Sequence, residues 1–130
     1  NGDVVIADTA EDETVGKAVE IQGIINHEVV SGLHTIPCRP QLKFSPNFLG
    51  FLLNSPNFHN QLKPLIQGIK VSSISKQTLG ETTLYFPIDL VEQERIGSLL
   101  NELETFITLH RQKFKNLQNL KKALLEQMFV

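Results

Sequence analysis

The stretch FPIDLVEQERIGSLLNELETF, residues 86–106, decides how this chain is organised. Pro87 ends the segment before it, and Asp89 with Glu92 three residues later forms a capping box, a pattern that starts helices. No proline follows Pro87 in the sequence. The pattern predicts one helix from Glu92 to Met128, which would be about 55 Å long at ~1.5 Å per residue.

Apolar residues recur along this helix at heptad spacing, which predicts a coiled-coil stripe. With Ile96 at position a, most of them fall at positions a, d and e, and His110, Lys113 and Gln127 interrupt the stripe. A globular part of about 90 residues is only about 25–30 Å across and cannot cover the stripe, so we expect a partner helix. The expected interface residues are Ile96, Leu99, Leu100, Leu103, Phe106, Ile107, Phe114, Leu117, Leu120, Leu124 and Met128.

Charge divides the helix into an acidic first half and a basic second half. Two copies laid antiparallel would set acidic halves against basic halves, whereas parallel copies would set like against like. The same distribution also complements the helix dipole, which explains it without a partner. The first half carries Glu92, Glu94, Glu102 and Glu104 against the one base Arg95, and the second half carries Arg111, Lys113, Lys115, Lys121 and Lys122 against the one acid Glu126.

The whole chain has 130 residues and a net charge of −2, unevenly distributed. Residues 1–28 carry seven acids and one base, whereas residues 29–86 carry five bases and one acid. The basic middle could face a phosphate backbone, or it could be an ordinary solvated surface. The single cysteine, Cys38, suits a reducing cytoplasm. No apolar run is long enough for a membrane span, no signal peptide precedes the first strand, and we expect the natural start to lie upstream.

Residues 1–87 predict a small mixed α/β domain, and residues 88–130 the long helix, so the fold class is α+β. Strands are expected at 3–7, 16–23, 27–40 and 82–86, with Ala18, Val19 and Ile21 near the core, and an acidic loop at 8–14. Serine followed by proline predicts helix starts at Pro46 and Pro56, the second helix running toward Gly68 with a kink at Pro64. Residues 69–74 are expected to form a loop, and Ser75 to cap a turn through Leu79.

No catalytic constellation emerges from the sequence. The four histidines and Cys38 lack zinc-ligand spacing. The acidic loop lacks the spacing of a calcium loop. We therefore expect no enzymatic activity, no metal and no cofactor.

The segment FPIDLVEQERIGSLL resembles the start of the conserved spacer helix in DNA-specificity subunits of type I restriction-modification enzymes. GDVVIA with VGK (2–17) resembles the opening strand of the target recognition domain in that family. FLGFLLNSPNF (48–58), GIKVSSISKQTLGETTLYFP (68–87) and LKKALLEQMF (120–129) are similar to its late helical segment, its connection to the spacer and its helix end. The order and spacing of these motifs cover nearly the whole chain.

The resemblance implies a non-catalytic cytoplasmic subunit in which two such helices pack antiparallel between two recognition domains. Its implied partners are double-stranded DNA and the methyltransferase and restriction subunits. Compared with the family pattern, we expect one recognition domain without its early part. On this resemblance the chain would be either a fragment of a longer subunit or a truncated half-subunit that dimerises. The alternative function is a dimerising adaptor or regulatory chain that does not read DNA.

The residues expected to contact DNA combine cations, which suit phosphates, with hydroxyls that can reach phosphates or bases. Each has an ordinary alternative: Ser75 as a helix cap, Lys17 as a surface charge, His34 as a strand residue. The primary candidates are Lys70, Ser72, Ser73, Ser75 and Lys76, and the secondary ones are Lys17, His34, Arg39 and Lys43.

Overall fold

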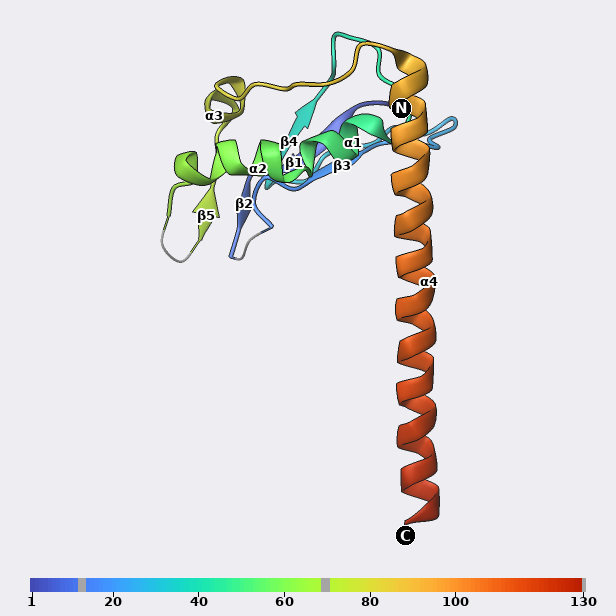
Figure 1. Ribbon diagram of the computed structural model, residues 1–130. Helices are drawn as coiled ribbons and strands as arrows, with labels where there is room; N and C mark the ends of the chain where they lie inside the picture. The colour runs from blue at the N-terminus through green and yellow to red at the C-terminus, as the bar shows by residue number, and fades with distance from the viewer. Residues whose placement is uncertain (12–13, 69–70, 130) are drawn as a thin grey trace. The chain divides into compact units, whose positions relative to one another are not determined.

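The computed structural model describes residues 1–11, 14–68 and 71–129. It contains small β-sheets and short helices followed by one long C-terminal helix, which confirms the α+β class predicted from the sequence (Figure 1). Contacts divide the chain into two compact units, Asn1–Ser98 and Leu99–Val130. The long helix therefore begins inside the first unit, and each unit is described by itself.

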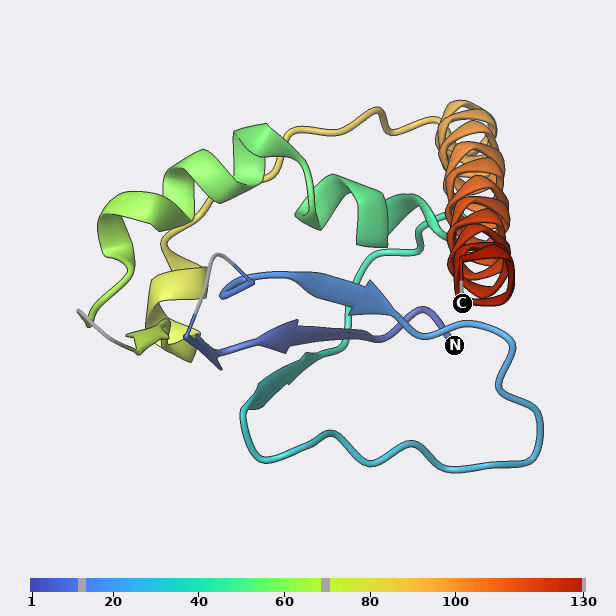
Figure 2. The same ribbon diagram turned by 90° about the horizontal axis from the view of Figure 1, so that it is seen from below.

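A three-stranded antiparallel sheet forms the centre of the first unit. Its strand order is β3 (Ala18–Glu20), β1 (Val4–Ala7) and β4 (Thr35–Cys38). Two short helices, α1 (Phe48–Leu53) and α2 (Pro56–Leu62), lie on one face of this sheet (Figure 2). The helices therefore cover one face of the strands and leave the other uncovered.

Alternation along the strands decides which side chains enter the core. In β1, Val4 and Ile6 are buried against the helices, and Val5 points to the other face, where it pairs with Val19 and Pro37. The expectation that Val19 lies near the core is wrong, because it follows the buried Ala18 and is 63% exposed. The core cluster consists of Val4, Ile6, Val15, Ala18, Leu49, Leu53, Phe58, Leu62 and Ile74.

The expected strand at 27–40 is much shorter than the sequence suggests. β1 has only four residues, and its last one, Ala7, pairs with Thr35. Residues 27–34 consequently have no partner strand and run as an exposed loop, with Val30 and Leu33 about 90% exposed (Figure 2).

Two side-chain amides take the place of strand partners. Asn54 accepts from the backbone N–H of Ala18 at 3.1 Å and donates to its carbonyl at 2.7 Å. Gln61 does the same for Thr83, with distances of 2.9 and 3.0 Å. The expected strand at 82–86 is therefore wrong: the segment is extended chain whose backbone groups at Thr83 bond to a helix side chain rather than to a sheet.

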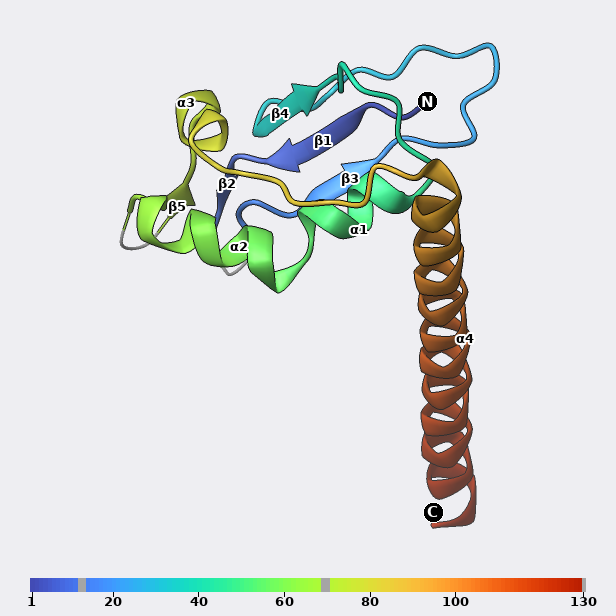
Figure 3. The same ribbon diagram turned by 45° about the horizontal axis from the view of Figure 1, so that its top comes forward.

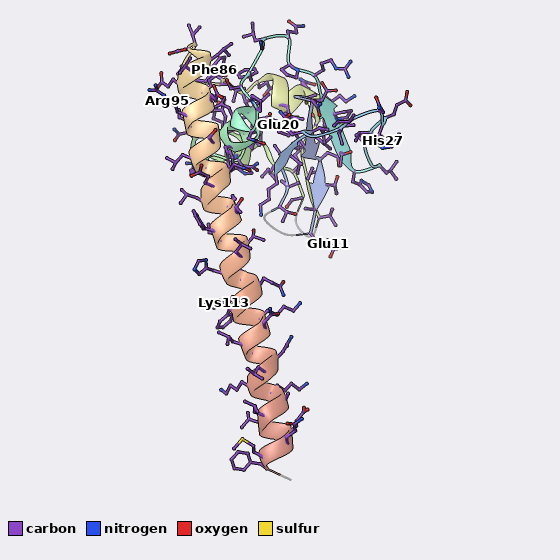
Figure 4. All side chains as sticks on the ribbon, turned by 90° about the vertical axis from the view of Figure 1, so that its right-hand side faces the viewer. Glu11, Glu20, His27, Phe86, Arg95 and Lys113 are labelled. Carbon is purple, nitrogen blue, oxygen red and sulfur yellow. The ribbon has the colours of Figure 1, made fainter. Side chains whose placement is uncertain are left out.

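The first short helix starts later than expected. Asn47 has a left-handed backbone with φ of 66°, which ends any helical continuation toward Pro46, so α1 begins at Phe48. Glu20 caps its N-terminus from β3, because its two carboxylate oxygens accept from the N–H groups of Asn47 and Gly50, each at 2.8 Å (Figure 4). The carboxylate also lies where the positive end of the helix dipole favours a negative charge.

The start predicted at Pro56 is confirmed, since Ser55 accepts from the N–H of Phe58. The helix does not run toward Gly68. A 3₁₀ turn, η1 (Lys63–Leu65), follows α2 directly and contains the proline that was expected to kink the helix. The chain is extended at the next residue.

A second, two-stranded sheet joins β2 (Thr9–Ala10) to β5 (Ser72–Ser73) (Figure 3). The segments expected to be loops at 8–14 and 69–74 thus each contribute a short strand. Helix α3 (Lys76–Gly80) follows β5, and its Ser75 cap is confirmed by a bond from the N–H of Thr78 at 3.1 Å.

Helix α4 spans Leu90–Met128, 39 residues, which confirms the single long helix. Asp89 caps it by accepting from the N–H of Val91 at 2.9 Å. Its first turns are held in the first unit by Gln93, which is 1% exposed. The side-chain amide of Gln93 accepts from the N–H of Ser45 and donates to the carbonyl of Pro87.

The second unit is the remainder of α4. Apart from the half-buried Leu100, the leucine, isoleucine, phenylalanine and methionine side chains of its described residues are exposed to solvent, as are the charged ones (Figure 4). A helix this rich in exposed leucine and phenylalanine has no core of its own.

Candidate functional site

The loop expected to contact DNA is partly a β-strand. Ser72 and Ser73 are half-buried and pair with Ala10 and Thr9 respectively. Lys70, the leading phosphate candidate, lies outside the described residues. Ser73 also bonds Gln67 through its backbone in both directions. The backbones of these two serines are therefore held in sheet geometry.

Ser75 and Lys76 lie at the start of α3. The Ser75 hydroxyl accepts from Thr78, so its capping role accounts for its position. Lys76 is exposed, and its charge is near enough to Cys38 to oppose the rise that burial produces in the pKa of that thiol. Of these two residues, Lys76 is the one with a free charge to offer a phosphate.

An acidic residue lies directly beside this candidate surface. The carbonyl of Asp8 accepts from the N–H of Ile74 at 2.8 Å. Its side-chain Oδ1 is buried without a hydrogen-bond partner, and His34 Nδ1 lies 3.9 Å away. Part of the acidic stretch is therefore a neighbour of β5. Its negative charge makes the potential over Ser72 and Ser73 less favourable for phosphates.

Arg39 is engaged in an ion pair. It donates through Nε and Nη2 to the carboxylate of Asp3, the shorter distance being 2.6 Å. The guanidinium hydrogen-bonded to Asp3 lowers the pKa of that carboxyl. Both groups are exposed, so the pair adds little to stability.

The secondary candidates do not converge on one place. Arg39 and His34 flank opposite ends of β4, about 16 Å apart at ~3.3 Å per residue. Lys43 is exposed in the loop after Pro40. The structure thus does not gather these cations into one binding site.

Lys17 lies close enough to His59 and Lys63, residues distant from it in the sequence, for the charges of both lysines to act on the histidine. The turn before it packs on α2, where an added Cβ on Gly16 would lie 2.8 Å from Leu62 and 3.7 Å from the ring of His59. Burial lowers the pKa of His59, and the charges of Lys17 and Lys63 lower it further. We define Lys17, His59 and Lys63 as the α2 cluster. The i, i+4 spacing of His59 and Lys63 was the signal in the sequence for two of its members.

The first unit also contains an open apolar cavity of about 420 Å³. The cavity is lined by residues of the sheet, of α1 and α2, and of the segment at 82–86. The thiol of Cys38 belongs to this lining. Burial raises the pKa of that thiol, so it is held in its protonated, unreactive form. The described residues contain no group of three or more histidine, cysteine, aspartate or glutamate side chains placed to hold a metal ion.

The expected helix interface divides between the two units. Ile96 is half-buried within the first unit. Leu100 is also half-buried, and the remaining nine residues are exposed, from 43% at Ile107 to 71% at Met128. Their apolar surface is therefore available to another helix.

Across the part of the chain that the structure describes, no helix is long and apolar enough to cross a membrane. A scan against protein-family models finds no family that matches the chain, and a search of curated proteins also finds no match.

Proposed function

We propose that this chain is a non-catalytic DNA-specificity component of a type I restriction-modification complex. In this role it binds double-stranded DNA through the first unit and holds methyltransferase subunits, and through them the restriction subunits, by its long helix. Such a complex works in the cytoplasm, where it meets DNA. The long helix with its uncovered apolar stripe is the observation that carries the proposal.

The helix supports an assembling role because its exposed stripe is too long to be incidental. Isolated helices are marginally stable in water, and most gain their stability by burying an apolar face. Leu103, Phe106 and Leu117 are each about half exposed. A partner helix would bury them.

The motif that resembles the family is used structurally in this chain. Pro87 and Gln93, both in that motif, bond to each other, and Gln93 also binds Ser45. The buried Gly97 lets the backbone of Pro46 approach the helix. The motif thus fixes the first turns of α4 onto the first unit, as a subunit that transmits position along a helix requires.

The α2 cluster supports a DNA-facing role for the first unit. Lys63 lies in the 3₁₀ turn after α2 and Lys17 directly precedes β3, and the charges of both act on His59. Lysines contact phosphates without regard to sequence. Base reading would fall to neighbouring hydroxyls such as Ser72 and Ser73.

The adaptor function is the second candidate, and one observation favours it. Arg39 is bonded to Asp3, and Asp8 lies beside β5, so acids offset part of the basic middle. A chain of this kind would pair through its helix with methyltransferase or specificity subunits and leave DNA reading to them.

One assay separates the two functions. The chain is mixed with its matching methyltransferase subunits, and binding to duplex DNA is measured with and without it by fluorescence anisotropy. The specificity function predicts sequence-dependent affinity that requires this chain. Assembly with the methyltransferase but no contribution to DNA affinity would establish the adaptor instead. Methyl transfer by the chain alone, abolished by a point mutation in it, would overturn both.

A further inference from the structure

We infer that the apolar cavity of the first unit binds an aliphatic carboxylate of medium chain length, with its chain inside the cavity and its carboxylate beside Arg39 at the rim. The volume of about 420 Å³ has room for about 14 heavy atoms at ~30 Å³ each, the share of a water molecule in the liquid. Decanoate falls within this size. None of the described residues that line the cavity belongs to β5 or to the α2 cluster, so the inference goes beyond the proposed function.

The cavity exists because extended chain, rather than a helix, forms one of its walls. Side chains of extended chain alternate between two faces. Thr82, Leu84 and Phe86 line the cavity and are half-buried, whereas Thr83 and Tyr85 between them are exposed. The segment therefore brings only every second side chain to this wall, and space remains between it and the sheet.

Contacts outside the cavity hold this wall in place. Gln61 bonds both the N–H and the carbonyl of Thr83. The rings of Phe44 and Phe86 lie with their centroids 5.0 Å apart and their planes at 60°, within the range that aromatic pairs prefer. A site that is formed before its ligand arrives loses less free energy to ordering when the ligand binds.

The interior of the cavity suits a hydrocarbon chain. Cavities with apolar linings stay free of water and bind apolar molecules. Thr82, a polar side chain of the wall, donates to the carbonyl of Leu79 at 2.7 Å and so needs no partner from the ligand. The buried lining consists of Val4, Ile6, Leu49, Leu53 and Phe58.

Cations near the rim give the ligand its direction. Arg39 lines the cavity and donates through Nε and Nη2 to Asp3, and in the part of the chain that the structure describes no hydrogen bond involves its Nη1. The charge of Lys76 acts on Cys38, another residue of the lining. These two positive charges exceed the single negative charge of Asp3, and a carboxylate at the rim would balance them.

Cys38 reports whether the cavity is occupied, because it lies in the lining and is the one cysteine of the chain. The full-length protein is treated with a neutral disulfide reagent in increasing decanoate, kept below the concentration at which decanoate forms micelles. We expect the rate of Cys38 modification to fall severalfold and to level off as one site fills. The control chain carries Cys38→Ser with Leu117→Cys, and its exposed thiol on α4 should react at one rate throughout. A constant rate at Cys38, or equal protection of both thiols, would overturn the inference.

Chain length and head group test the two parts of the site separately. Affinity should rise by about threefold to fourfold for each CH₂ added from hexanoate to decanoate. Lys76→Gln should weaken decanoate by about two- to fivefold, the range for an exposed charge, and leave decanol unchanged. Lys122→Gln, on α4, should change neither. Equal affinity of the wild type for decanol and decanoate would show that the head group is not recognised and would exclude the carboxylate.

Filling the cavity locates the ligand. Leu84→Trp adds bulk at the wall, and because the chain has no tryptophan, blue-shifted fluorescence confirms that the indole is buried. Decanoate should then no longer protect Cys38, whereas Tyr85→Trp, at a position that is 85% exposed, should leave protection as it is. Full protection in Leu84→Trp with a buried indole would place decanoate elsewhere. The chain-length series uses the unaltered protein, so it decides the matter even if the indole disturbs the fold.

Discussion

The backbone N–H of Ser45 donates to Oε1 of Gln93 at 3.1 Å, joining residues 48 positions apart. The hydroxyl of Ser45 also donates to the carbonyl of Leu90 at 2.7 Å. Ser45 had been expected to cap the first short helix, but it binds the start of α4 instead. The contact therefore ties the loop before α1 to the long helix.

Replacing Gln93 with leucine should destabilise the first unit. The change leaves the buried N–H of Ser45 and the half-buried carbonyl of Pro87 without their partner. An unsatisfied buried group costs about 1–3 kcal/mol. Urea unfolding followed by circular dichroism should show a lower midpoint. The matched control, Gln112→Leu, changes an exposed glutamine on the same helix and should leave the midpoint of the first unit unchanged.

Replacing Gly97 with alanine should also destabilise, although alanine favours helices. A Cβ at this position would lie 2.9 Å from the carbonyl oxygen of Pro46 and 3.2 Å from the nitrogen of Phe48. Both are backbone atoms that cannot turn away, and overpacking of this kind costs about 1–3 kcal/mol. Gly80→Ala is the control, because nothing lies within 4 Å of its added Cβ. The melting temperature should fall for Gly97→Ala and stay the same or rise for Gly80→Ala. Equal shifts in the two variants would contradict the close approach of Gly97 to the backbone of Pro46 and Phe48.

Glu20→Ala should unfold α1 before the rest of the unit. The carboxylate holds two backbone N–H groups, and hydrogen bonds to charged groups contribute about 1.5–3 kcal/mol each. Two such bonds predict a loss of about 3–6 kcal/mol in the free energy of unfolding. Faster hydrogen exchange over 48–53 would locate the loss. Glu28→Ala removes an exposed carboxylate in the long loop and should change neither quantity.

Local signals were enough to predict some elements from the sequence. The long helix follows from a cap, sustained apolar spacing and the absence of proline after Pro87. The caps at Ser55 and Ser75 follow from the same local chemistry, in which a hydroxyl accepts from an N–H three residues later. Each of these features is decided within a few residues or by a long repeat.

Contacts between distant residues account for the elements that were predicted wrongly. Glu20 lies 27 residues before Asn47, yet it helps place the start of α1. Gln61 bonds the backbone N–H and carbonyl of Thr83, the groups that would pair with a neighbouring strand if 82–86 belonged to a sheet. No periodicity in the sequence marks a side-chain amide as a substitute for a strand. The alternation of the chain alone therefore could not distinguish strand from extended loop.

The candidate site was predictable only in part. Lys17 was named from its charge, but its neighbours His59 and Lys63 come from a helix that meets it only in the folded chain. The pairing of β2 with β5, which brings Asp8 next to Ile74, is likewise a tertiary contact. The resemblance to specificity subunits predicted a DNA-binding surface, but only the fold determines which cations lie near one another on it.

His59 should make stability depend on pH below neutrality. Burial, followed by Lys17 and Lys63, lowers its pKa beneath the ordinary 6.5. The unfolded chain then takes up this proton at a higher pH than the folded chain does. Stability from this group is complete above 6.5 and is lost as the pH falls through the lower folded value. Comparing wild type with His59→Gln by urea unfolding from pH 7.5 to 4.5 should show the difference changing in that window.

A titration by nuclear magnetic resonance checks the cause. In Lys17→Gln with Lys63→Gln the pKa of His59 should rise but stay below 6.5, since burial remains its largest cause. Lys122→Gln, on α4, serves as the control. An unchanged pKa of His59 in the double variant would mean that the charges of Lys17 and Lys63 do not act on the imidazole.

The α2 cluster should also govern the salt dependence of DNA binding. Each phosphate contact that is lost flattens the slope of log affinity against log salt by about 0.9. Lys17→Gln with Lys63→Gln should therefore weaken binding to all sequences and flatten the slope, measured with the methyltransferase subunits present. Bound phosphates should also raise the pKa of His59, because a nearby negative charge favours the imidazolium. Lys122→Gln should leave the slope as it is in wild type.

A second pair of lysines tests the surface expected from the sequence. Lys70→Gln with Lys76→Gln should flatten the slope as well if DNA reaches β5, and Ser72→Ala or Ser73→Ala should then change sequence preference by about 1–3 kcal/mol per base contact. The α2 cluster and β5 would in that case form one continuous face. If only the Lys17→Gln/Lys63→Gln variant changed the slope, the DNA would contact the α2 cluster and not the surface beside Asp8, whose carboxylate repels phosphates. Unchanged slopes in both double variants would instead favour the adaptor, which assembles through α4 and leaves DNA to its partners.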